Sequence, residues 1–528
     1  MSTRTAALQP PRPDSPARSG HRQVALPALA GAVSAGLALG LSELISAFLP
    51  GATSLVAAVG QRVIDLQPPG AKDLVVAWFG TNDKFALEVV VTVAALLIGA
   101  LLGVVAVRRF AVAAAGFVVF GAVGGVAALA IPTASAPIVA LEAIAAVAAG
   151  LQALTSLLAR LPVGGTDDRR RPPPDPARRS FLLRSAAVGA GAVVTGLLGR
   201  TLIDRGRTAP SEVGSLPPPS VVVPPLAAGA DLAPSTPGLT PIVVPNDDFY
   251  RIDTALLVPS VDVATWTLRI HGLVERETVL TWTELLALPQ FEQYVTISCV
   301  SNVVGGHLVG NTKWTGIRLR DVLELAGVRP EATQLVGRSV DGWTAGMPTA
   351  WIMDPAREPM VAVQMNDAPL PRAHGFPARL IVPGLYGYVS ATKWLAELEL
   401  TTLEAFDGYW VPLGWAKEGP ILTQSRIDTP NSSAGAGRVA VAGVAWAPDR
   451  GIAKVEVSID GTWYDATLST PISDATWVQW VLPWQAVPGD HVLSVRATDG
   501  HGVLQEQHPS PPAPDGARGW HTVSVHVA

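Results

Sequence analysis

The chain has 528 residues, of which 49% are hydrophobic and only 15% are charged, and its formal net charge is -5. This composition excludes a single soluble globular protein and indicates membrane-spanning segments joined to further domains. The basic residues form no stripe interleaved with aromatic residues, so we expect no nucleic-acid partner.

Four long apolar runs near the N-terminus predict a transmembrane helical module over 24–161. Each run is long enough to cross a hydrocarbon core of about 30 Å. The runs are Val24–Leu49, Ala86–Val107, Phe110–Ile131 and Pro137–Leu161. Residues 1–23, rich in proline, arginine and serine, are expected to form a disordered tail. Between the first two runs, 51–85 predicts an outer loop with an interfacial helix, with a re-entrant pair as the alternative.

Basic residues give this module an orientation. Arginines occur in the N-terminal tail, at Arg108 and Arg109 between the second and third runs, and within 169–179 after the fourth run. With four spans, all of these positions fall on one side of the membrane, which the positive-inside rule assigns to the cytoplasm. We therefore expect a multi-pass protein of a bacterial cell membrane.

Residues 162–207 combine a basic loop with a shorter apolar segment. Ala177–Arg184 reads Ala-Arg-Arg-Ser-Phe-Leu-Leu-Arg and precedes the apolar run Ser185–Gly199. This order is similar to a twin-arginine export signal placed inside the chain. The alternative is a fifth membrane helix with a basic flank. Both interpretations place the residues after Arg200 outside the cytoplasm.

A change of composition separates the membrane region from the C-terminal domains. The proline-rich residues 208–245 predict a semi-rigid extended spacer. Residues 246–403 then mix short strand and helix patterns, which predicts an α+β domain. The expected elements are strand Trp266–Gly272, helix Thr281–Leu288 capped by Thr281 or Thr283 with Glu284, strand 294–298, helix Ile317–Ala326 and strand Arg379–Val382.

Cys299 is the only cysteine, so it cannot form an internal disulfide. The residues before it predict a strand, and Gly305 and Gly306 after it predict a turn, which places the thiol where a strand opens into a loop. A functional thiol in this position acts as a nucleophile or a metal ligand. The alternative is a small hydrophobic residue of the core.

Residues 404–528 predict a β-sandwich of the immunoglobulin-like type. Short alternating runs are separated by turn sequences such as Pro-Gly-Asp and Asp-Gly. The runs are Gly437–Ala447, Ala453–Ile459, Thr476–Leu482, His491–Ala497 and Trp520–Val527. The tryptophans between 446 and 484 fit core or domain-interface positions, with carbohydrate binding as the alternative.

Five segments, in order, resemble the molybdopterin-binding domain of the sulfite oxidase family. They are Asn246–Arg251, Ile297–Asn302, Trp314–Asp321, Pro371–Gly384 and Tyr386–Trp394. Five ordered matches over about 150 residues are far more specific than one short motif. The resemblance implies an oxidoreductase with a molybdenum–molybdopterin cofactor, in which Cys299 binds the metal as a soft thiolate.

The same resemblance implies the other residues of the site. Arg379 and Lys393 are the candidates for binding the cofactor phosphate, one as a planar cationic fork and one as an ammonium. Arg251 is expected to face the metal pocket and the substrate, and Tyr386 or Tyr388 to donate a proton. The further cofactor-binding candidates are Phe249, Tyr250, Asn302, His374, Ser390 and Thr392. The turn ending at Lys393 is one residue longer than the family pattern, which leaves the roles of Ser390 and Thr392 open.

Departures from the family pattern bear on the substrate. Cys299 is followed by Val-Ser-Asn-Val-Val, where sulfite oxidases have Ala-Gly-Asn-Arg-Arg, so both arginines that suit a sulfite dianion are lost. Asp253 adds a carboxylate that is expected near the mouth of the site, where it would repel anions. The expected reaction is a two-electron oxygen-atom transfer on a small substrate. A sulfoxide reductase and a cofactor-free binding or assembly module are the alternatives.

The resemblance also bears on partners. The sandwich takes the place of the family's dimerisation domain, so a homodimer through this domain is expected. The electron-transfer partner, a quinone or a cytochrome, is not specified by the sequence. The four apolar runs hold no histidine pair suited to haem, and we expect no haem.

Overall fold

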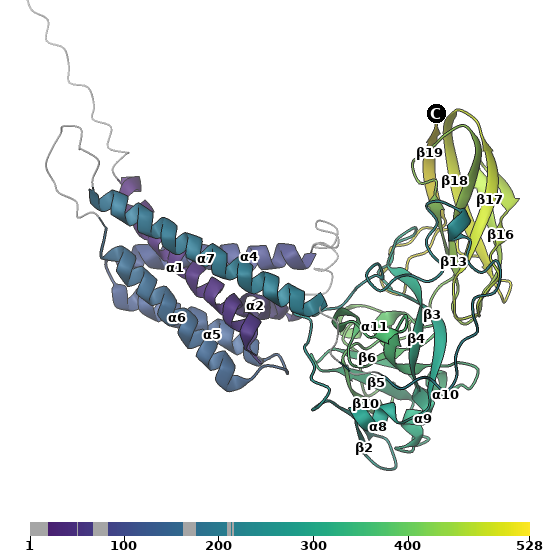
Figure 1. Cartoon of the computed structure of the whole chain (residues 1–528), viewed down its shortest axis with the longest axis horizontal. Helices are drawn as coiled ribbons and strands as arrows, with labels where there is room; N and C mark the ends of the chain where they lie inside the picture. The colour runs from purple at the N-terminus through teal and green to yellow at the C-terminus, as the bar shows by residue number, and fades with distance from the viewer. Residues whose placement is uncertain (1–19, 50, 67–82, 162–175, 209–212, 214–215) are drawn as a thin grey trace, which may run out of the picture. The chain divides into compact units, whose positions relative to one another are not determined.

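The computed structural model describes residues 20–49, 51–66, 83–161, 176–208, 213 and 216–528 (Figure 1). The described residues up to Arg205 form one compact unit, and those from Gly206 onward form a second. The predictions for the tail up to residue 19, for 67–82 of the outer loop and for 162–175 of the basic loop lie outside the described residues.

The first unit consists of helices. Five of those in the described residues are long and apolar enough to cross a membrane, and α2 (Leu55–Asp65) is a shorter helix whose N-cap is Ser54. The long helices are α1 (Gly20–Phe48), α4 (Asp83–Ala106), α5 (Phe110–Leu129), α6 (Ala136–Leu158) and α7 (Pro176–Thr208). Four of them lie within a few residues of the predicted apolar runs, because hydrophobic length alone specifies such a helix.

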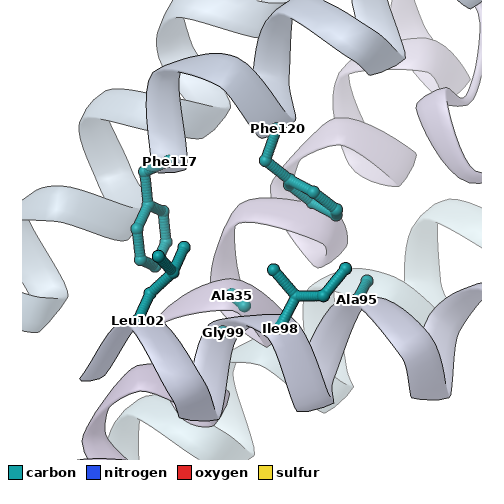
Figure 2. Close-up of a pocket in the computed structure, with 7 residues that line it drawn as sticks. All are labelled: Ala35, Ala95, Ile98, Gly99, Leu102, Phe117 and Phe120. Atoms are coloured by element: carbon teal, nitrogen blue, oxygen red, sulfur yellow. The ribbon is translucent and has the colours of Figure 1, made fainter. Parts of the chain in front are cut away.

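Small residues allow α1 and α4 to approach closely. A Cβ atom added to Gly31 would lie 2.0 Å from the carbonyl oxygen of Gly99, so a side chain at this position would push the helices apart. Figure 2 shows a small crevice beside this contact, among α1, α4 and α5. Its lining is entirely apolar and consists of Ala35, Ala95, Ile98, Gly99, Leu102, Phe117 and Phe120.

Two buried carboxylates join α1, α2 and α6. Glu142 is fully buried and accepts a hydrogen bond from Ser42 Oγ at 2.6 Å. Glu43 accepts a hydrogen bond from the hydroxyl of Ser54. Since a polar group inside an apolar bundle needs a partner, these contacts fix the start of α2 against the long helices.

Helix α7 is continuous across both the arginine pair and the apolar run that follows it. An ion pair of 2.6 Å between Arg200 and Glu88 connects α7 with α4. The fifth-helix alternative therefore has the secondary structure that it requires.

Two sheets form the first part of the second unit. One has the strand order β2-β1-β10-β5-β6, and the other has the order β3-β4-β7-β8, with β9 paired to β7. The strands are β1 (Thr267–Gly272), β2 (Thr278–Thr281), β3 (Gln290–Ser298), β4 (Val309–Arg318), β5 (Gln334–Ser339), β6 (Thr344–Pro348), β7 (Met360–Met365), β8 (Ala368–Pro369), β9 (Arg379–Ile381) and β10 (Leu395–Thr401). Buried apolar side chains from both sheets, among them Leu268, Val361 and Leu398, form one core.

Short helices connect these strands. They are α8 (Trp282–Leu286), α9 (Leu319–Glu324), α10 (Thr349–Met353) and α11 (Gly387–Ser390). The predicted cap of α8 is present, because Thr281 and Glu284 form a reciprocal capping box. Helix α9 is shorter than predicted, since Ile317 belongs to β4, where its side chain is fully buried.

The remaining strands form two further sheets in the part of the chain where a sandwich was predicted. Their orders are β11-β13-β17-β16 and β12-β19-β18-β14-β15. The strands are β11 (Gln424–Thr429), β12 (Ser433–Ala434), β13 (Gly437–Trp446), β14 (Ile452–Ile459), β15 (Thr462–Asp465), β16 (Thr467–Leu468), β17 (Val478–Ala486), β18 (Gly489–Asp499) and β19 (His521–Val527). Val441, Val455, Trp480 and Val495 share one core between the sheets, which fits the core role predicted for the tryptophans.

Residues 208–245 were predicted to be a semi-rigid extended spacer, but from Leu216 onward this segment bonds to and packs on the neighbouring strands. The Ser220 N–H donates to the Gln290 carbonyl at 2.8 Å, and the Leu232 N–H donates to Gln479 Oε1 at 2.6 Å. Ile242 is 2% exposed within the core of the α+β part. The prolines of this segment do not favour a strand, but single extended residues still pair with neighbouring strands and bury apolar side chains.

Candidate active site

Cys299 directly follows β3, at the start of the loop that leads to β4. Its N–H donates to the carbonyl of Leu308 at 2.9 Å, and its Sγ lies 2.9 Å from the hydroxyl oxygen of Ser301. Asn302 Oδ1 accepts a hydrogen bond from the Leu308 N–H at 2.8 Å, so this predicted cofactor residue braces the loop from within. The thiol is only partly buried, as expected for a side chain presented at a strand end and not for a core residue.

Arg379, the first residue of β9, is a buried cation. Its Nη1 donates to the His374 carbonyl at 3.1 Å, and its guanidinium carbon lies 5.0 Å from the centre of the Trp314 ring. In the described part of the chain, no carboxylate pairs with Arg379 and its Nε has no hydrogen-bond partner. Burial lowers the pKa of Arg379 to about 10. The position therefore favours an anionic or hydrogen-bond-accepting group.

His374 presents a second unsatisfied atom beside this cation. Its Nε2 lies 3.2 Å from the carbonyl oxygen of Asn246, and because a carbonyl only accepts, Nε2 carries the proton. Burial, with the charges of Lys393 and Arg379, lowers the pKa of His374 to about 3, so the ring is neutral at pH 7. Its Nδ1 is buried and, among the described residues, has no partner. This atom is available to accept a hydrogen bond.

Aromatic rings connect the cation to Tyr250. The Phe249 ring stacks on Tyr250 with 5.2 Å between centroids and meets Trp314 and His374 edge-on at 6.0 and 5.9 Å. Burial first, and then the nearby Cys299, raise the pKa of the Tyr250 hydroxyl, while Arg379 opposes this. Tyr250 therefore lies within electrostatic reach of both predicted cofactor ligands.

The two candidate proton donors lie in different surroundings. Tyr386 is 3% exposed, and burial raises its pKa to about 12, with a further contribution from Cys299. Its hydroxyl oxygen accepts from the Leu422 N–H at 3.4 Å, which leaves its own proton to be donated. Tyr388 instead donates to the Ala416 carbonyl at 2.7 Å. Among the described residues, the Tyr388 hydroxyl thus has an acceptor for its proton and the Tyr386 hydroxyl has none.

Lys393 and Asp253 form an ion pair that the sequence did not predict. Their charged atoms are 3.0 Å apart, and the two side chains are 10% and 8% exposed. Lys393 also donates to the Ala373 carbonyl at 3.1 Å. The expectation that Asp253 presents a repelling charge at the mouth of the site is wrong, because this carboxylate is buried and paired. Arg251 is exposed, and its charge reaches His374.

The hydroxyls of Ser390 and Thr392 hydrogen-bond to carbonyls of the chain. Ser390, the last residue of α11, donates to the carbonyl of Tyr386, the N-cap of that helix, at 2.9 Å. Thr392 donates to the Gly337 carbonyl at 3.4 Å and is fully buried. These contacts shape the turn before Lys393, so in this structure both side chains support the site from behind.

Besides the Lys393–Asp253 ion pair, sequence reasoning missed two further features of the site. One is the platform that Trp314 provides for Arg379, although Trp314 begins one of the five matched segments. The other is the approach of 515–518 to Tyr386: a Cβ atom added to Gly516 would lie 2.6 Å from the Tyr386 hydroxyl oxygen. No local pattern indicates that a turn so far along the chain covers this tyrosine.

Comparison with known proteins shows which family this chain belongs to. Residues 255–410 match the family described as oxidoreductase molybdopterin binding domain. Mitochondrial sulfite oxidase of Mus musculus is 30% identical over 343 residues, which cover 54% of this chain and 62% of that protein. The oxidoreductase YuiH of Bacillus subtilis is 34% identical over 158 residues, 30% of this chain and 76% of YuiH. The chain belongs to the sulfite oxidase family.

As a member of the sulfite oxidase family, the protein is an oxidoreductase enzyme, and its molybdopterin-binding domain implies a molybdenum cofactor. Arg379 Nε and His374 Nδ1, which have no partner among the described residues, fit such a group, because a pterin with its phosphate offers an anion and ring N–H donors. Among solved structures, the sulfane dehydrogenase SoxCD of Paracoccus pantotrophus is similar with a TM-score of 0.47 and 22% identity, covering 54% of this chain and 83% of that one.

Proposed function

We propose that the chain is a membrane-anchored oxidoreductase whose catalytic part lies outside the cytoplasm of a bacterial cell. There it transfers an oxygen atom, in a two-electron reaction, to or from a small substrate. The observation that carries this proposal is the buried Arg379, which has no carboxylate partner among the described residues and lies over the Trp314 ring, from which Phe249 and Tyr250 continue the same cluster. The partly buried Cys299 thiol and Arg379 both act electrostatically on Tyr250. Five apolar helices support membrane attachment.

Each of these residues has a defined role in the proposal. Cys299 would hold the metal through its thiolate, Arg379 would neutralise the cofactor phosphate, and His374 Nδ1 would offer an acceptor to the cofactor's N–H groups. When bound, the cofactor supplies the two-electron redox chemistry and the site for oxygen transfer. Tyr386 holds a proton near Cys299 for an oxygen that leaves as water. Lys393, compensated by Asp253, fixes the turn that follows α11.

Two reactions of this type are chemically distinct. A sulfite-type oxidation adds an oxygen atom from water to the substrate and releases two protons and two electrons. A sulfoxide reduction consumes two protons and two electrons and releases a sulfide and water. In the first case Arg251, which is exposed, binds the oxyanion.

One observation favours sulfoxide reduction as the second candidate. Val303 is 55% exposed on the loop that carries Cys299, at a position where sulfite oxidases have an arginine. An exposed apolar side chain on this loop suits an uncharged thioether or sulfoxide better than a dianion. The direction of the reaction is therefore best tested with both substrate classes side by side.

Further parts of the proposal concern the architecture. The two-sheet C-terminal part is an immunoglobulin-like sandwich that supports a homodimer, and a quinone or a cytochrome exchanges electrons with the enzyme. The paired sheets around Val441 and Trp480 support the sandwich. The chain spans 62% of the length of the mouse sulfite oxidase, so activity and partners of that protein are not carried over whole.

Metal analysis of the purified full-length chain tests the proposal. We expect about one molybdenum and one oxidisable pterin per chain, with the metal lost in Cys299→Ser and retained in the control Val303→Ser on the same loop. A panel of sulfite, sulfoxides and N-oxides with artificial electron carriers then assigns the reaction. A chain produced with ample molybdenum that binds neither metal nor pterin would refute the proposal.

A further inference from the structure

Arg426 of β11 joins three separate segments of the second unit. Its Nε donates to Asp428 at 2.6 Å, its Nη2 to the hydroxyl of Thr240 at 2.9 Å, and its Nη1 to the Gly306 carbonyl at 2.9 Å. The Arg426 and Asp428 side chains are 3% and 4% exposed. Gly306 lies in the loop 299–308, called the thiol loop because it begins with Cys299. A buried guanidinium from the C-terminal sheets is thus bonded directly to this loop.

A second contact between the same two parts lies next to the first. Gly305 has a φ of +74°, and a Cβ atom added to it would lie 2.2 Å from the His521 ring of β19. The ring itself is held by the Ile427 N–H, which donates to His521 Nδ1 at 3.0 Å. Glycine at 305 therefore serves both the left-handed backbone and the close approach of the ring. The thiol loop rests on β11 and β19 through two neighbouring residues.

Hydrogen bonds inside the thiol loop connect Gly306 with Cys299. The Cys299 N–H donates to Leu308, the Leu308 N–H donates to Asn302, and the Gly306 N–H donates to Val303 at 2.9 Å. The first bond joins the two ends of the loop, and the other two connect residues 306 and 308 with its middle at 302 and 303. Removing the guanidinium would leave the Gly306 carbonyl and the buried Asp428 without this hydrogen-bond donor. Leaving buried acceptors without their donor destabilises the folded state.

We propose that Arg426, supported by Asp428 and His521, is a positioning residue for Cys299, so that the C-terminal sheets complete the active site. This inference rests on the proposed role of Cys299 as the metal ligand. Its physical basis is the direct bond from a buried, ion-paired guanidinium to the thiol loop. The positioning itself is a property of the chain and does not require the cofactor to be bound.

The single cysteine allows a direct test. In the full-length chain purified from cells grown without molybdenum, N-ethylmaleimide reacts at one site, and its rate reports how far the thiol is held in place. We expect Arg426→Gln to raise this rate by about fivefold or more, because the loop opens more often. Arg426→Lys, which keeps the charge, should restore part of the protection.

A matched control comes from another ion pair between the same two parts. Arg357 pairs with Asp449 at 2.6 Å, and its other contacts in the described residues are with Asp354 and Trp351, not with the thiol loop. We expect Arg357→Gln to leave the maleimide rate within about twofold of the parent, since its loss does not reach the loop. An equal acceleration in Arg357→Gln and Arg426→Gln would overturn the inference, as would a parental rate in Arg426→Gln.

Gly305→Ala gives an independent route if Arg426→Gln does not fold. The added methyl group meets the His521 ring, so we expect the thiol to react faster, and we expect the Gly305→Ala, His521→Ala pair to react more slowly than Gly305→Ala alone. Parental reactivity in Gly305→Ala contradicts the inference. Because the assay needs no metal, it remains decisive even if Cys299 proves not to bind molybdenum.

Discussion

Replacing Arg379 by methionine separates what stabilises the fold from what binds the cofactor. Burial shifts the pKa of this guanidinium from 12.5 to about 10, which corresponds to roughly 3 kcal/mol at about 1.4 kcal/mol per unit. This is the free energy by which burial disfavours the charged form. Methionine removes that penalty, and it also removes the hydrogen bond to His374 and the contact with Trp314, each worth about 1 kcal/mol. The net change is therefore about 1 kcal/mol in favour of the variant.

Urea unfolding of the cofactor-free, full-length chain in detergent can be measured by tryptophan fluorescence. We expect Arg379→Met to unfold at the same urea concentration as the parent or at a slightly higher one. The same variant produced with molybdenum should retain no pterin, because the phosphate loses its counter-charge. Arg338→Met is the control. Because Arg338 is ion-paired with Glu399, we expect its replacement to lower the stability of the fold and to leave pterin retention unchanged. The reasoning would be refuted if cofactor-free Arg379→Met lost more than about 2 kcal/mol of unfolding free energy relative to the parent. It would also be refuted if Arg379→Met produced with molybdenum retained its pterin.

Three further changes test the site. The pKa of His374 is about 3 in the folded chain and 6.5 in the unfolded chain, so the unfolded state takes up the proton at a higher pH than the folded state. The unfolding free energy of the cofactor-free chain should therefore fall by roughly 5 kcal/mol as the pH is lowered from 6.5 to 3. His374→Gln should flatten that slope in pH-dependent unfolding, and parallel slopes would count against the assignment. Tyr386→Phe should lower kcat by about a hundredfold while Tyr388→Phe leaves it near the parent, because only Tyr386 keeps a proton to donate; equal losses in steady-state kinetics would contradict this. Val303→Arg should raise kcat/KM for sulfite relative to a sulfoxide by about tenfold through one charge-assisted hydrogen bond, and an unchanged ratio would show that position 303 does not face the substrate.

Much of the fold is encoded locally and could be predicted. The long apolar helices follow from hydrophobic length, and the capping box of α8 follows from the spacing of Thr281 and Glu284. The position of Cys299 at the end of a strand follows from the β-branched residues before it and the glycines after it. In each case, the interactions that specify the structure join residues close together in sequence.

The remaining features depend on residues that meet only in the folded chain. Strand β11 was not predicted because its polar sequence lacks a clear alternation, yet its Arg426 bonds to a loop 120 residues away. The pairing of Lys393 with Asp253 likewise neutralises the carboxylate that was expected to repel anions. A sequence shows which charges a chain carries. Only the tertiary structure decides which of them are buried together. A buried charge without a partner costs free energy, and burial arises when distant segments pack against each other.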